Sequence, residues 1–165
     1  MHVAPERMQP VAATPRGVGG TIVLATVAVP FDPAGERVAI DAALETGGQL
    51  VLVNVRDMPH APMTTMLCGP DGTTFPHEEA RAEVRASAQR AADLGVRTLL
   101  LRVGTRHPAR ALLEVAAEQS AALLVFAPDR SAMPTRRFRR MARAIRRKAG
   151  CLVWVTLDDR AGRAT

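Results

Sequence analysis

Five short apolar runs alternate with stretches of helical pattern, and this alternation restricts the possible fold more than any other feature of the chain. The apolar runs lie at 21–27, 49–55, 98–103, 121–126 and 151–157. The helical stretches between them lie at 36–45, 78–94, 107–120 and 136–149. Continuous apolar runs are typical of strands that are covered on both faces, and strands that alternate with helices form parallel sheets. The sequence therefore predicts a single doubly wound α/β domain with a five-stranded parallel sheet and helices on both faces.

The length of 165 residues corresponds to about one domain, which we expect at 21–157. Residues 1–20 hold three prolines and three glycines and are predicted to form a disordered tail, while 158–165 are predicted to form a polar tail. No apolar run reaches the roughly 18 residues of a membrane span. Residues 1–20 also lack the continuous apolar segment of a secretion signal. We therefore expect a cytoplasmic protein without a membrane span.

Positive charge is concentrated near the end of the expected domain. Residues 130–148 include nine basic and no acidic residues, whereas 13 basic and 16 acidic residues lie elsewhere in the chain. Within 136–149, apolar residues recur at i, i+3, i+4 and i+7, which predicts one helix face packed on the sheet. Arginines cover the opposite side and form a candidate anion or partner patch: Arg136, Arg137, Arg139, Arg143, Arg146 and Arg147.

The sequence leaves four interpretations of this patch open. It is the solvated face of a surface helix, whose late cations suit the helix dipole. Alternatively it binds a nucleotide phosphate or another small anion through charge-assisted hydrogen bonds. The third interpretation is contact with nucleic acid, driven by counterion release. The fourth is docking to an acidic partner or to a membrane surface. Because the chain has no Tyr, four Phe and one Trp, a stacking platform for single strands is not expected.

Three local strings follow one another in the second half of the chain: PARALLEVA at 108–116, AALLVFA at 121–127 and AGCLVWV at 149–155. In this order they resemble the third helix, the fourth strand and the closing strand of the universal stress protein family. The runs at 21–27 and 49–55 match in pattern, so the resemblance covers roughly 21–157. It implies a homodimer through the last strand at 151–157, where an apolar edge strand also needs cover.

Family members that bind ATP carry a glycine motif after the fourth strand: Gly, two residues, Gly, nine residues, Gly, then Ser or Thr. Glycines let the backbone approach the phosphates at a helix start. The nearest positions here hold no glycine, and none occurs between 127 and 149. The resemblance therefore implies a degenerate nucleotide site. Its candidate residues are Asp32 after the first strand, Val55 at the end of the second, and Ala127, Arg130 and Arg140 in place of the glycines.

The long connection at 56–77 gathers soft potential ligands: Met58, His60, Met63, Met66, Cys68 and His77. Their spacing matches no metal template, so we expect no metal site, and we expect the loop to cover the carboxyl edge of the sheet. No Ser or Cys lies on a strand-to-helix elbow beside a base, and Cys151 opens a strand that we expect to be buried. Catalysis is therefore not expected.

These features together predict a non-enzymatic stress-response or regulatory protein with a degenerate nucleotide site. One alternative is an ATP-binding stress protein that holds the phosphates with an arginine-rich loop. The other is a module that binds nucleic acid or an acidic partner through the basic helix.

Overall fold

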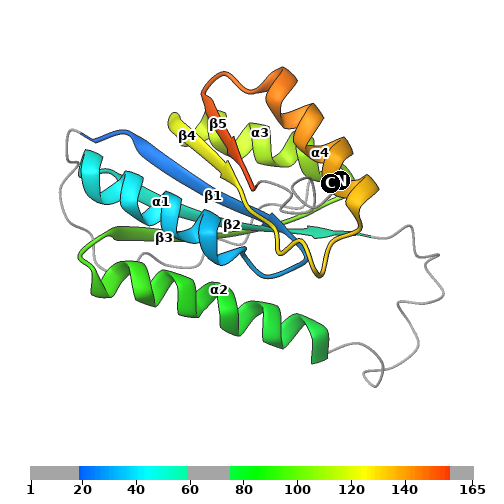
Figure 1. The fold of residues 1–165 in the computed structure, drawn as a ribbon, viewed down its shortest axis with the longest axis horizontal. Coiled ribbons are helices and arrows are strands. Elements are labelled where there is room, and N and C mark those ends of the chain that lie inside the picture. The colour runs from blue at the N-terminus through cyan, green and yellow to red at the C-terminus, as the bar shows by residue number, and fades with distance from the viewer. Residues whose placement is uncertain (1–18, 59–74, 157–165) are drawn as a thin grey trace, which may run out of the picture.

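The computed structural model describes residues 19–58 and 75–156, including all of their side chains apart from those of 75–80. Within these residues, strands and helices alternate along the chain (Figure 1). They are β1 (Thr21–Val27), α1 (Pro33–Thr46), β2 (Gln49–Asp57), α2 (Phe75–Asp93), β3 (Arg97–Thr105), α3 (Pro108–Glu118), β4 (Ala121–Phe126), α4 (Thr135–Lys148) and β5 (Leu152–Val155).

The strands form one sheet in the order β3-β2-β1-β4-β5, and all four neighbouring pairs are parallel. The chain builds the sheet outward from β1 to β3, then crosses back to add β4 and β5 on the other side. The strand order therefore reverses between β1 and β4, and loops that leave the carboxyl ends of these two strands meet at a topological switch point. The predicted doubly wound α/β fold is confirmed.

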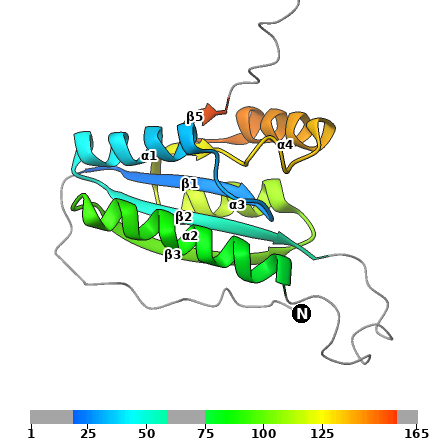
Figure 2. The same ribbon diagram turned by 60° about the horizontal axis from the view of Figure 1, so that its bottom comes forward.

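Helices cover both faces of the sheet, so each face has its own apolar core (Figure 2). Alternate residues of a strand point to opposite faces. Val23 and Val27 of β1 therefore pack with α3 and α4, whereas Ile22 and Leu24 pack with α1 and α2. This two-sided burial explains why the strands are continuous apolar runs.

Several element boundaries differ from the sequence-based prediction. Helix α1 begins at Pro33 and not at 36, because Asp32 caps it and proline suits the first helical turn. Strands β2 and β3 continue two residues further than expected and stay in register as far as Asp57 and Thr105. Strand β5 is limited to Leu152–Val155. The predicted tails at 1–20 and 158–165 lie outside the described residues, apart from Gly19 and Gly20.

Candidate functional site at the switch point

The loops that follow β1 and β4 are hydrogen-bonded to each other across the switch point. Phe31 and Pro128 form an isolated antiparallel bridge. The Asp32 N–H donates to the Ala127 carbonyl at 2.9 Å, and the Asp129 N–H donates to the Pro30 carbonyl at 2.9 Å. In open α/β sheets this crevice is where ligands bind. Here these two N–H groups and two carbonyl groups, which face across the crevice, are hydrogen-bonded to one another.

The loop after β1 is also fixed on its other side, toward β2. The Ala28 N–H donates to the Val55 carbonyl at 2.9 Å and lies 3.3 Å from Asn54 Oδ1. The buried Thr26 hydroxyl donates to the Val29 carbonyl at 2.8 Å. The loop therefore has hydrogen bonds to both neighbouring strands.

Asp32 acts as the N-cap of α1. Its Oδ2 accepts from the Gly35 N–H at 3.0 Å, and its carbonyl accepts from the Glu36 N–H at 2.9 Å. A side-chain oxygen in this position satisfies one of the free N–H groups at a helix start. The carboxylate that the resemblance suggested for a nucleotide contact thus has a structural role in this conformation.

Several residues of the two joined loops and of the chain that follows them are buried. Phe31 is 7% exposed, Met133 is 4% exposed and Ala127 is fully buried. Helix α1 also approaches β4 closely, because a Cβ added to Gly35 would lie 2.1 Å from the Ala127 Cβ. Only glycine permits this approach without a shift of the backbone. The residues at the junction of the two loops are therefore buried, and α1 lies close against the chain that leaves β4.

Arg130 points back onto α4. Its guanidinium carbon lies 3.6 Å from the centroid of the Phe138 ring, a cation–π contact. The Phe138 ring in turn stacks on Phe126, with centroids 5.8 Å apart and an interplanar angle of 14°. Sequence reasoning treated Phe138 only as a core residue and did not identify its contact with Arg130.

A separate hollow of about 460 Å³ lies between the end of β2 and the start of α4. Its lining residues are Asp57, Pro134, Arg136, Arg137 and Arg140. Arg137 Nη2 donates to Asp57 Oδ2 at 2.7 Å. Arg140 therefore lies with the start of α4, while Asp32, Val55 and Ala127 meet at the β1 loop. Of the five candidate nucleotide residues, Arg140 alone is among the residues that line this hollow.

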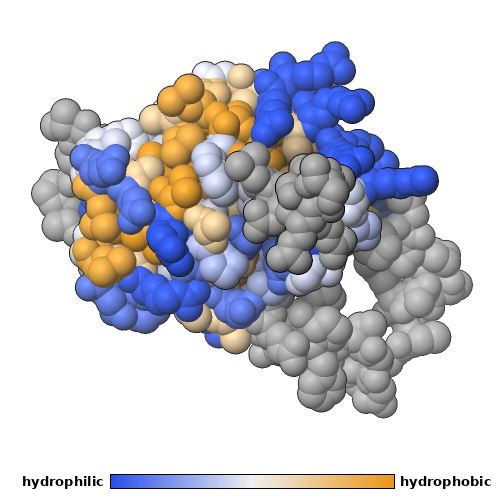
Figure 3. Space-filling model, in the orientation of Figure 1, coloured by the Kyte–Doolittle hydropathy of each residue, from blue (hydrophilic) through white to orange (hydrophobic). Residues whose placement is uncertain are grey.

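Helix α4 presents one strongly cationic side. Its apolar residues Phe138, Met141 and Ile145 are buried on the sheet. The opposite side is the arginine face of α4, which we define as Arg136, Arg139, Arg140, Arg143, Arg146 and Arg147, all exposed. It appears as the large blue area over α4 in Figure 3. Of the predicted patch, Arg137 is half-buried and turns toward Asp57.

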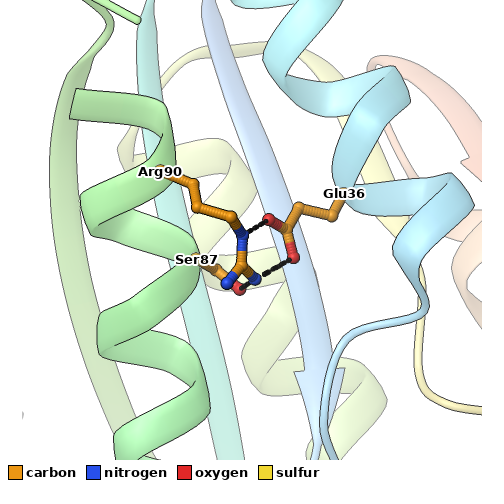
Figure 4. Close-up of polar contacts among 3 residues, drawn as sticks. All are labelled: Glu36, Ser87 and Arg90. Carbon is orange, nitrogen blue, oxygen red and sulfur yellow. Dashed lines mark hydrogen bonds and ion pairs between the residues drawn. The ribbon is translucent and has the colours of Figure 1, made fainter. Parts of the chain in front are cut away.

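On the opposite face of the sheet, a partly buried ion pair joins α1 to α2 (Figure 4). Arg90 Nε donates to Glu36 Oε1 at 2.7 Å and its Nη2 donates to Oε2 at 2.9 Å, while the Ser87 hydroxyl donates to Oε2 at 2.8 Å. Burial alone would raise the pKa of Glu36, but the hydrogen bonds from Arg90 and Ser87 outweigh it and hold this pKa below its ordinary value of 4.5. The sequence carried no signal for this pair, because its members are 54 residues apart.

The remaining candidates add no reactive group to the site. Cys151 precedes β5 and is half-buried; burial raises the pKa of its thiol, although a backbone hydrogen bond at Leu124 partly offsets this. A thiol with a raised pKa is a weak nucleophile at neutral pH. Thr105 ends β3, and its hydroxyl accepts from the His107 N–H at 3.0 Å. The predicted ligand loop lies mainly outside the described residues, since only Met58 of the six has a described side chain.

Comparison with known proteins agrees with this architecture. The model of the universal stress protein family matches residues 19–156. Solved structures with the same fold include a universal stress family protein from Burkholderia pseudomallei, at 20% identity and a TM-score of 0.60, covering 86% of this chain and 98% of that one. Another is a universal stress protein from Archaeoglobus fulgidus in complex with dAMP, at 19% identity and a TM-score of 0.57, covering 84% and 98%. A third, in complex with cAMP, has 17% identity and a TM-score of 0.57, covering 85% and 98%.

The chain belongs to the universal stress protein family. No curated protein sequence matches it. Within the residues that the structure describes, no helix is long and apolar enough to span a bilayer.

Proposed function

We propose that this chain is a non-enzymatic stress-response or regulatory protein of its family whose nucleotide site is degenerate. The observation that carries the proposal is the pair of backbone hydrogen bonds between the β1 and β4 loops. A nucleotide held by the backbone of these loops would have to break both bonds, and so separate the two loops beside Phe31, which is 7% exposed. This separation is not needed in a protein whose crevice is open before binding.

The composition of the β4 loop supports the same conclusion. Two structural neighbours are complexes with cAMP and dAMP, so the fold can hold an adenine nucleotide. Backbone cradling of phosphates requires free N–H groups and close approach, which glycine provides. In this chain Pro128 has no N–H, and the Asp129 N–H donates to Pro30. Asp129 Oδ1 also accepts from the Ser131 N–H at 2.8 Å, so the loop is closed on itself.

The hollow beside Asp57 supports a second candidate function, an ATP-binding protein that holds phosphates with arginines. Arg136 and Arg140 line this hollow, which has a volume of about 460 Å³. Guanidinium groups bind phosphate by bidentate hydrogen bonds. The hollow offers no apolar pocket for the adenine ring, because its lining residues are one proline, one aspartate and three arginines.

Calorimetric titration of the full chain with Mg-ATP distinguishes the two functions, at about 150 mM salt to screen weak surface attraction. We expect no saturable heat from the wild type or from Arg130→Ala and Arg140→Ala variants. Micromolar binding that is lost in either variant would contradict the degenerate site and establish the arginine-held nucleotide instead.

We also propose that the protein is a homodimer through β5. This strand is at the edge of the sheet, and Leu152 within it is 75% exposed. Figure 3 shows hydrophobic side chains on the side of the molecule where β5 lies. An exposed apolar edge strand favours pairing with another strand. Sedimentation analysis should show a dimer for the wild type and a monomer for Leu152→Asp; a wild-type monomer would refute the proposal.

A further inference from the structure

We propose that the arginine face of α4 binds the sugar-phosphate backbone of a nucleic-acid duplex without sequence specificity. The inference does not depend on the proposed function, because it concerns the exposed side of α4 and not the crevice. It gives the cationic surface a ligand of defined chemistry, a regular array of phosphates.

The arrangement of the arginines carries the proposal. Arg136, Arg140, Arg143 and Arg147 follow i, i+4, i+7 and i+11, so they form one straight line along the helix. At 1.5 Å of rise per residue this line is about 16 Å long. It lies opposite the buried residues Phe138 and Ile145. Arg139 and Arg146 flank it on one side, so the face is a cationic strip and not a scattered set of charges.

The charges of this strip are not balanced by the acidic side chains around it. Helix α4 contains no acidic residue, and its one ion pair with a described acidic side chain is that of Arg137 with Asp57. Helix α3 contrasts with it, because Arg110 is matched there by Glu114 at 2.7 Å. Cations at i and i+4 repel one another in the free protein. A bound polyanion would relieve this repulsion and release counterions, which favours association.

The start of α4 points to the same ligand. Its N-cap is Pro134, with no side-chain cap, and its first turn carries Arg136 and Arg137 in place of acidic residues. The positive end of a helix dipole favours anions, so these arginines are unfavourable there in the absence of a ligand. A phosphate near the first turn would interact well with both the dipole and the guanidinium groups.

Duplex phosphates fit this surface better than an acidic protein or a membrane does. Protein interfaces have an apolar or aromatic centre, and interfacial helices insert apolar residues into the bilayer. The large apolar side chains of α4, namely Phe138, Met141 and Ile145, are all buried in the core. A duplex presents about one charge per 1.7 Å of its axis with both strands counted, so a 16 Å length carries about ten phosphates, enough for each of the four arginines in the line to contact one.

Fluorescence anisotropy with labelled 20-base-pair DNA and RNA duplexes of arbitrary sequence tests this inference on the full chain. The test variant is Arg136→Gln/Arg140→Gln/Arg143→Gln/Arg147→Gln. The matched control, Arg37→Gln/Arg85→Gln/Arg106→Gln/Arg110→Gln, removes the same charge from exposed arginines elsewhere. The DNA and RNA duplexes decide which backbone is preferred.

We expect wild-type binding to weaken about 100-fold between 50 and 200 mM salt, as for roughly four phosphate contacts. The test variant should lose most of its affinity and lower the salt slope by about 3 to 4, whereas the control should keep the slope. Circular dichroism checks that both quadruple variants fold. If the test variant does not fold, the single variant Arg143→Gln still tests the inference, because it should lower the salt slope by about 1.

Three results would overturn the inference. The first is no duplex binding at 50 mM salt, and the second is an equal loss in both quadruple variants, which would reflect net charge alone. The third is tighter binding to polyglutamate or to vesicles with anionic lipid than to either duplex, which would assign the face to an acidic protein or to a membrane.

Discussion

The switch point and the arginine face of α4 differ in whether their polar groups have partners within the protein. At the switch point, Asp32 caps α1, and the backbones of the β1 and β4 loops bond to each other. On the arginine face, six exposed guanidinium groups have no described acidic partner. Buried polar groups must be satisfied internally, whereas exposed charges can be satisfied by solvent or a ligand. The contacts of the switch point therefore stabilise the fold, whereas the arginine face is exposed and can contact a ligand.

The largest effect is expected from opening the switch point. Phe31→Ala removes a ring that is 7% exposed at the junction of the two loops, and should lower the free energy of unfolding by about 3 kcal/mol. Leu44→Ala is the control, because this side chain is 46% exposed and its loss should cost less than about 1 kcal/mol. Urea unfolding at equal protein concentration measures both. Equal costs would mean that Phe31 does not hold the loops together.

The second comparison removes one arginine that has an acidic partner, in the α1–α2 ion pair, and one arginine from the arginine face. Arg90→Gln leaves the Glu36 carboxylate, 11% exposed, without its bidentate partner, and should destabilise the fold by about 1–3 kcal/mol. Arg143→Gln on the arginine face should change stability by less than about 0.5 kcal/mol. Thermal and urea unfolding report both changes. A comparable loss for Arg143→Gln would show that the arginine face has a structural role.

A third prediction concerns pH. The folded-state pKa of Glu36 is lowered by Arg90 and Ser87, which outweigh the effect of burial, so its ionised form favours the folded state. This stabilisation is complete above the ordinary value of 4.5 and is lost as the pH falls through the lower folded-state pKa. We expect the difference in unfolding free energy between wild type and Glu36→Gln to shrink across this range. A difference that is constant between pH 3 and 7 would contradict the ionised pair.

The smallest change in stability is expected from charge substitutions at the two ends of α4. Arg136→Glu places an acid in the first helical turn and should stabilise the protein by about 0.5 kcal/mol, whereas Arg147→Glu in the last turn should destabilise it by a similar amount. Both variants change the charge equally, so the sign of the difference isolates the helix dipole. Shifts of the same sign in urea unfolding would indicate that overall charge dominates.

The alternation of apolar runs was enough to predict the element order and the parallel sheet, because strands buried on both faces require such runs. The start of α1 was also readable, since Asp32 followed by Pro33 is a cap and a first-turn proline. The prediction used neither residue in this way and placed the start three residues late. The basic helix was predicted with its apolar stripe and its arginine side, and the structure buries Phe138 and exposes Arg143 accordingly.

The arrangement of the candidate site was not predictable, for physical reasons. The loops that close the crevice meet through backbone hydrogen bonds between Asp32 and Ala127, and backbone groups leave no pattern in the sequence. The stacking of Arg130 on Phe138 depends on how the β4 loop turns, which a loop without the family's glycines does not define from the sequence. The sequence identified the types of residue at the switch point but could not show which of them contact one another. Nucleotide binding, dimerisation and location in the cell stay predictions.

Residue-resolved NMR titration of the isotope-labelled full chain with Mg-ATP tests the central claim most directly, namely that the switch point is closed. We predict no saturable shift of the amide signals in the loops at 28–32 and 127–131, and at most weak, salt-sensitive shifts along α4, where arginines attract any phosphate. Saturable shifts centred on Asp32 and Ala127 would show that the two loops separate to admit a nucleotide, and the account of a degenerate site would be wrong.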